Sequence, residues 1–202
     1  LAEQTEATIN EAHGLWKAID RPNLMIKIPA TPQGIPAVRR CIADGINVNI
    51  TLMFSLEQYR SVAGAYIEAL EERLASGLPV DRMASVASVF VSRIDSLIDS
   101  LLEKIGSEEA LNLRGKGALA NSKLVYSEYQ RLFGDARWAR LASAGARPQR
   151  PLWASTSTKN PEYPRLMYVS PLVGPETVNT VPPDTLEAIL AEGRFEEQTV
   201  TE

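Results

Sequence analysis

One charged residue, Lys27, stands in the middle of an otherwise apolar run at residues 24–30. Side chains alternate along a strand, so Met25, Lys27 and Pro29 would share one face, opposite a wholly apolar face that helices would cover. This pattern places Lys27 in the interior of the protein. A buried lysine loses its charge readily, and a neutral amine attacks a carbonyl carbon to form a Schiff base. Two other interpretations stay open: Lys27 could pair with a buried carboxylate, or it could lie exposed on an edge strand.

Polar side chains also stand in or just after two later apolar runs. Asn49 and Thr51 are two residues apart, so they would share one face of a strand and could hydrogen-bond a substrate hydroxyl or a water. Ser88 and Arg93 flank the next run, where a guanidinium beyond a strand end could bind a phosphate with two hydrogen bonds. The alternatives are a polar strand end satisfied by neighbouring loops and a surface arginine at a helix start.

A third polar group, residues 155–160, follows the apolar residues 152–154. Its hydroxyls, its backbone amides and Lys159 make a plausible pocket for an anion, and the alternative is a hydrophilic loop. Lys159 also competes with Lys27 as the Schiff-base lysine. Its neighbours are polar, which indicates a more solvated amine and favours Lys27 as the nucleophile.

The elements that must position these groups alternate between strand and helix patterns. Strands are expected at residues 24–30, 46–54, 83–91, 152–156 and 178–181, and helices at 3–20, 35–44, 56–76, most of the stretch to about 143, and after 184. Repeated βα units with parallel strands predict either a doubly wound open sheet or a (β/α)8 TIM barrel.

Three features favour the barrel. The chain has no glycine-rich dinucleotide motif, polar residues stand within the strands, and the groups capable of chemistry lie in the later halves of the strands. A full barrel takes about 250 residues, so the five expected units would be part of one. Linkers are short, which predicts a single domain over residues 1–202.

Composition excludes several classes of function. The net charge of −4 argues against a protein that binds nucleic acid or a membrane surface. Cys41 and His13 are the only residues of their kinds, so a Cys/His zinc cluster is not available and no intrachain disulfide can form. The lack of a disulfide fits a reducing cytoplasm. No apolar stretch reaches the roughly 18 residues that a transmembrane helix needs.

Two adjacent segments form a longer and more specific pattern. Residues 25–35 read MIKIPATPQGI, and residues 45–55 read GINVNITLMFS. Together they closely resemble the transaldolase family. Residues 153–161 (WASTSTKNP) and 177–182 (TVNTVP) resemble the longer bacterial subfamily.

The resemblance implies a TIM barrel of the class I aldolase type. Such enzymes move a dihydroxyacetone unit from a ketose phosphate, sedoheptulose 7-phosphate or fructose 6-phosphate, to an aldose phosphate in the pentose phosphate pathway. They use a Schiff base and need no metal or organic cofactor. The residues that match the family's functional positions are Lys27 as the Schiff-base lysine, Asn49 and Thr51 with the threonine holding the catalytic water, Ser88 and Arg93 at the substrate and its phosphate, and Ser157 and Lys159 at the phosphate.

The chain departs from the family at both ends. It aligns from the helix after the third barrel strand, so the family's acid/base aspartate and glutamate have no counterpart here, and the C-terminal helix is cut short. We therefore expect an incomplete barrel that does not turn over by itself, as a monomer or a homodimer. Two other functions stay open: a Schiff-base aldolase that cleaves without transfer, and a non-catalytic partial barrel that pairs with another chain.

Overall fold

The computed structural model describes residues 3–201 and divides them into two compact units. The first unit comprises residues 3–53, 57–88 and 128–150. The second comprises residues 54–56, 89–127 and 151–201. The expectation of one domain over the whole chain stays a prediction.

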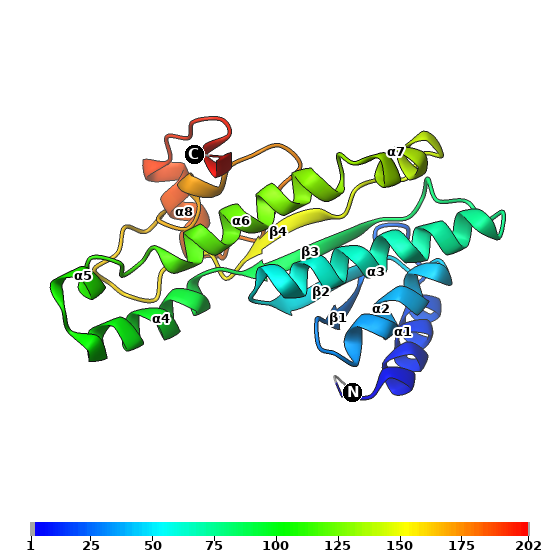
Figure 1. Cartoon of the computed structure of the whole chain (residues 1–202), viewed down its shortest axis with the longest axis horizontal. Coiled ribbons are helices and arrows are strands. Elements are labelled where there is room, and N and C mark those ends of the chain that lie inside the picture. Colours follow the sequence, from blue (N-terminus) through cyan, green and yellow to red (C-terminus); the bar gives the residue numbers. More distant parts are fainter. Residues whose placement is uncertain (1–2, 202) are drawn as a thin grey trace. The chain divides into compact units, whose positions relative to one another are not determined.

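Strands and helices alternate along the chain, and five parallel strands follow one another in the sheet order β1-β2-β3-β4-β5 (Figure 1). The strands are β1 (Ile26–Pro29), β2 (Val48–Met53), β3 (Ser85–Phe90), β4 (Arg150–Ala154) and β5 (Val178–Asn179). The helices are α1 (Thr5–Ile19), α2 (Gly34–Ala43), α3 (Leu56–Ala75), α4 (Ser92–Ile105), α5 (Glu108–Leu111), α6 (Gly117–Leu132), α7 (Ala136–Ser143) and α8 (Pro183–Glu192), with short 3-10 helices η1 (Ser170–Leu172) and η2 (Thr199–Thr201). Each strand begins within two residues of its expected start, so the α/β class predicted from the sequence is confirmed.

The turn from β1 into α2 is built on Thr31 and Gly34. The Thr31 hydroxyl oxygen accepts a hydrogen bond from the Gly34 N–H at 2.9 Å, and the Thr31 carbonyl accepts from the N–H groups of Gly34 and Ile35. A side chain at position 34 would fall well inside contact distance of the Pro29 carbonyl oxygen. Glycine is therefore required here by close approach, and the threonine satisfies N–H groups that the first turn of a helix leaves unpaired.

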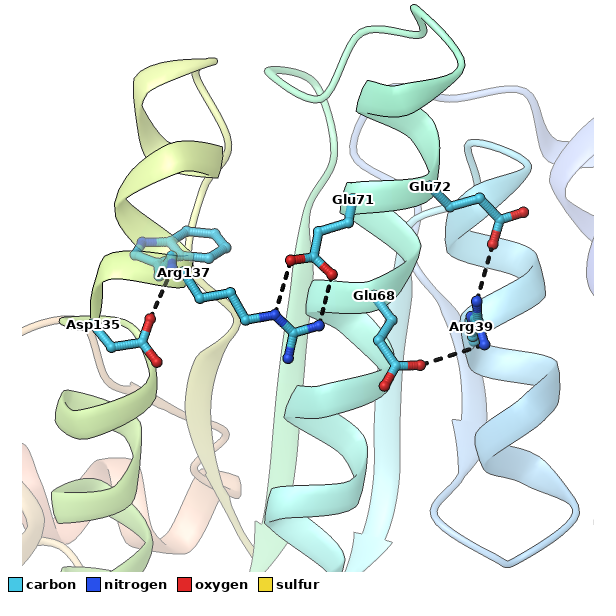
Figure 2. A network of polar contacts seen from close by, with 7 residues as sticks. Arg39, Glu68, Glu71, Glu72, Asp135 and Arg137 are labelled. Atoms are coloured by element: carbon cyan, nitrogen blue, oxygen red, sulfur yellow. Dashed lines mark hydrogen bonds and ion pairs between the residues drawn. The ribbon is translucent and has the colours of Figure 1, made fainter.

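Helix α3 is held on both sides by arginines of neighbouring helices in the first unit (Figure 2). Arg39 of α2 lies 3.4 Å from the carboxylates of both Glu68 and Glu72. Arg137 of α7 donates two hydrogen bonds, of 2.8 and 2.6 Å, to Glu71. Exposed ion pairs are worth little singly, so this network orients the helices more than it stabilises them.

A buried arginine links two segments of the same unit. Arg73, at the end of α3, is only 8% exposed, and its guanidinium donates to the carbonyls of Ala43 and Pro79 at 2.8–3.1 Å. One side chain thereby satisfies the C-terminal end of α2 and the connection from α3 to β3, whose carbonyls would otherwise be unpaired.

The second unit contains α4, α5, most of α6, β5 and all of β4 but its first residue, whereas α7 belongs to the first unit. The stretch expected to be helical up to about residue 143 is four helices, with breaks at Gly106 and Gly115 that both adopt a φ of +71°. The core includes Trp153, whose indole N–H donates to the Leu172 carbonyl at 2.9 Å. Among residues 3–201 the structure contains no helix both long enough and apolar enough to cross a membrane.

Candidate functional site

Three neighbouring strands of the first unit bring Lys27, Asn49 and Ser88 into one row. Lys27 lies opposite Asn49 in the parallel register of β1 and β2, as Pro29 lies opposite Thr51. The Ser88 hydroxyl on β3 donates to the Asn49 Oδ1 at 2.7 Å. An amide whose oxygen is already used as an acceptor offers its nitrogen as a donor, so Asn49 can present an N–H group beside the amine of Lys27. The three side chains therefore lie on one face of the sheet.

The expectation that Lys27 is buried is wrong for this structure. The side chain is exposed, whereas its strand neighbours Ile26 and Ile28 are 6% and 1% exposed. Lys27 lies on the edge strand of the sheet, and α1 and α2 bury the opposite face of β1. A groove of about 210 Å³ between α1 and β1 runs past it. The Lys27 amine is thus accessible from solvent rather than enclosed in a core.

Thr51 lies two residues before the end of β2, and the residue after it has an unusual conformation. Thr51 is half-buried, like Asn49, and shares its face as predicted. Leu52 adopts a φ of +59°, in the left-handed region that non-glycine residues rarely enter. Ordinary extended backbone therefore ends at Thr51.

In the second unit the ends of β3 and β4 are joined by backbone and hydroxyl hydrogen bonds. The N–H of Ser92 donates to the Ser155 carbonyl at 3.0 Å, and the two hydroxyls lie 3.0 Å apart. Ser155 itself has a φ of +56°. Next to it, the fully buried Thr156 hydroxyl donates to the Asn179 Oδ1 of β5 at 2.9 Å. Hydroxyl and amide groups thus line the ends of three successive strands.

Two cations of the second unit stand near these strand ends. Arg93 is the second residue of α4 and is exposed, with its guanidinium 5.1 Å from the centre of the Phe90 ring. Lys159 is exposed and donates to the Ser157 hydroxyl at 2.8 Å. In residues 3–201 neither cation forms an ion pair with a carboxylate. Both remain available to an anionic group.

Sequence reasoning did not single out Ser92 or Asn179 as part of this arrangement. The signal was present, because each stands directly after or at the end of a strand pattern, where parallel strands gather their functional groups. Within the described residues no group of three or more His, Cys, Asp or Glu side chains could hold a metal ion. The chemistry that these residues offer comes from an amine, hydroxyls, amides and cations.

A parallel α/β sheet here carries an accessible lysine in line with an amide and a hydroxyl, which are groups that can take part in carbonyl chemistry. The whole chain, residues 1–202, matches the family described as Transaldolase/Fructose-6-phosphate aldolase, and the chain belongs to that family. The resemblance seen in the sequence is confirmed.

Similar proteins include transaldolases of several bacteria. The transaldolases of Thermobifida fusca (strain YX) and of Mycolicibacterium smegmatis (strain ATCC 700084 / mc(2)155) are each 54% identical over 200 residues, which covers 99% of this chain and 54% of each relative. That of Parafrankia sp. (strain EAN1pec) is 52% identical over 201 residues. The chain spans about half the length of these curated relatives.

Proposed function

We propose that this chain is the Schiff-base half of a transaldolase, which transfers a dihydroxyacetone unit from a ketose phosphate to an aldose phosphate. The observation that carries the proposal is the register of Lys27 with Asn49, together with the hydrogen bond from Ser88 to that amide. Membership of the family supports it.

The proposed reaction begins at the Lys27 amine. The amine adds to the C2 carbonyl of fructose 6-phosphate or sedoheptulose 7-phosphate, and loss of water gives an iminium ion. The bond between C3 and C4 then breaks, its electron pair enters the iminium to form an enamine, and the C4 hydroxyl loses its proton to leave an aldose phosphate. The enamine attacks the carbonyl of a second aldose phosphate, and water releases the new ketose from Lys27.

The resemblance to the family suggests roles for the other site residues. Asn49 and Ser88 hold the substrate hydroxyls next to the iminium, and Thr51 holds the water that enters and leaves. Arg93 and Lys159, which have no carboxylate partner among residues 3–201, bind the phosphate with the Ser157 hydroxyl. The chain contains no match for the family's acid/base aspartate and glutamate, so by itself it should form the adduct but not turn over.

The proposed architecture is a single TIM-barrel domain of which this chain supplies five βα units. The parallel strands in sequential order support it, because consecutive βα units build a barrel in that order. The buried, unpaired Cys41 fits a location in a reducing cytoplasm.

Borohydride trapping tests for the Schiff base. The experiment uses the protein encoded by the longest reading frame that contains this sequence. Treatment with fructose 6-phosphate and borohydride should add a stable sugar adduct, which mass spectrometry locates on the peptide carrying Lys27. Lys27→Arg should abolish the adduct, and Lys17→Arg, which alters an exposed lysine of α1, should leave it intact. An adduct that persists in Lys27→Arg would show that another amine is the nucleophile.

A second candidate function is cleavage without transfer, because the family description includes fructose-6-phosphate aldolase. The two reactions share the enamine and differ in its fate. Free dihydroxyacetone that accumulates from fructose 6-phosphate in the presence of an aldose acceptor would favour the aldolase.

A further inference from the structure

Helix α4 carries two aspartates one turn apart, Asp95 and Asp99, which use their oxygens in the same way. In Asp95 the Oδ1 accepts from the Ala118 N–H at 2.7 Å, near the start of α6. Its Oδ2 accepts from the Tyr168 hydroxyl at 2.9 Å, in the connection from β4 to β5. The carboxyl is 1% exposed, and burial raises its pKa. A buried acceptor of this kind is costly to leave unpaired.

Asp99 repeats the pattern one turn later. Its Oδ1 accepts from the Gly115 N–H at 2.9 Å, and its Oδ2 accepts from the Tyr163 hydroxyl at 2.6 Å. Burial and the hydrogen bond to Asp99 raise the pKa of Tyr163 to about 12, so the hydroxyl stays a proton donor at neutral pH. Gly115 also leaves room for the tyrosine ring, because a side chain there would lie 3.2 Å from the Tyr163 Cζ and against Met167.

These contacts fix both ends of the segment that carries the proposed phosphate ligands. At one end, Ser155 is bonded to Ser92, the first residue of α4. At the other end, Tyr163 and Tyr168 are bonded to Asp99 and Asp95 of the same helix. Lys159 lies between these two attachment points, and Arg93 stands on α4 itself. One helix therefore bears one phosphate cation and anchors the loop that bears the other.

We propose that Asp95 and Asp99 are positioning residues for the phosphate of the substrate, acting through Tyr168 and Tyr163 on the loop that carries Ser157 and Lys159. This inference rests on the proposed function. A binding group on a loop is placed less accurately than one on a helix or strand unless contacts of this kind hold the loop. The hydrogen bonds are made to carboxylates, the stronger class, so loss of one hydroxyl should loosen the loop measurably. Each carboxylate keeps its second hydrogen bond, to a backbone N–H.

The test removes single hydroxyl groups and measures two probes on the protein encoded by the longest reading frame that contains this sequence. Inorganic phosphate binding, followed by calorimetry, reports on the loop, and borohydride trapping of unphosphorylated dihydroxyacetone reports on Lys27. Tyr163→Phe and Tyr168→Phe should each weaken phosphate binding about tenfold, or ~1.4 kcal/mol, and leave trapping unchanged. Tyr66→Phe, which removes a hydroxyl bonded to the Arg147 carbonyl at 2.8 Å in the first unit, should change neither.

A conservative variant separates positioning from a general loss of structure. Asp99→Asn keeps an oxygen and should retain most of the phosphate affinity, whereas Asp99→Ala should lose it to the extent that Tyr163→Phe does. The proposal is overturned if the wild-type protein binds no phosphate, if the tyrosine variants affect neither probe or both alike, or if Tyr66→Phe weakens phosphate binding equally. If phosphate binding changes as expected but the wild-type protein traps no dihydroxyacetone, the loop assignment stands and the Schiff-base function falls.

Discussion

Replacing Gly34 by alanine sets two effects of opposite sign against each other. Gly34 is the first residue of α2, and alanine is favoured over glycine within helices by about 1 kcal/mol. The added methyl group, however, would fall well inside contact distance of the Pro29 carbonyl oxygen and 3.0 Å from the Thr31 Oγ1. The oxygen belongs to the backbone of β1, so it cannot rotate away as a flexible side chain would.

The structure indicates that the clash is the larger effect. Relief of the contact requires the strand end or the first turn of α2 to move, and inserting a methyl group into close-packed structure costs about 1–3 kcal/mol or more. Because the obstacle is backbone, we take the upper end of this range, which leaves a net loss of about 2 kcal/mol after the gain in helix propensity. With a slope of about 2 kcal/mol per molar urea, the unfolding midpoint should fall by about 1 M.

Two matched glycines in the same unit serve as controls. Gly14 in α1 and Gly64 in α3 have no atom within 4 Å of the position that a Cβ would take. Gly14→Ala and Gly64→Ala should therefore raise the free energy of unfolding by up to about 1 kcal/mol, measured by urea titration followed by circular dichroism. An unchanged or raised midpoint in Gly34→Ala, at an unchanged slope, would refute the close approach of α2 to β1.

Two further substitutions test the pH dependence of stability and the row of polar residues at Lys27. The hydrogen bonds from Arg131 and Arg60 lower the pKa of Glu128 to about 2, below its ordinary value of 4.5, so its contribution to stability is complete above about pH 5 and is lost as the pH falls toward 2. Urea midpoints measured from pH 6 to pH 2.5 should fall less steeply in Glu128→Gln than in the wild-type protein, and parallel curves would contradict this. Ser88→Ala removes the hydrogen-bond donor to Asn49, so it should lower the free energy of unfolding by about 1 kcal/mol and slow the trapping of dihydroxyacetone. An unchanged trapping rate would show that the hydrogen-bonded row of Lys27, Asn49 and Ser88 takes no part in the reaction.

The strands and helices could be predicted well because the sequence patterns that indicate them are local. Residues 46–54 alternate and are rich in β-branched side chains, and the strand β2 (Val48–Met53) lies within them. Alternation also placed Asn49 and Thr51 on one face. The pairing of Lys27 with Asn49 depends on the register between strands, and the bond from Ser88 depends on a third strand, so neither could be read from one segment.

Burial was harder to predict than secondary structure, because it depends on what covers a face. The alternation in β1 separates Lys27 from Ile26 and Ile28 but does not say which face is covered, and the structure leaves the lysine exposed. Arg73 is the converse case, a charged residue near a helix end whose burial no local pattern indicates. It is buried because its guanidinium binds carbonyls, including that of Ala43, 30 residues earlier.

Two residues near the ends of strands of the sheet hold strained backbone. Among the described non-glycine residues with positive φ, Leu52 follows Thr51 near the end of β2, and Ser155 follows the end of β4. A left-handed conformation costs a non-glycine residue about 1–2 kcal/mol, and glycine would avoid this cost. At Ser155 the hydrogen bonds with Ser92 hold the strained conformation in place and aim the chain into the loop of Lys159. Strained backbone of this kind persists only where the surroundings hold it, and at Ser155 the bonds to Ser92 do so at the start of the loop predicted to bind phosphate.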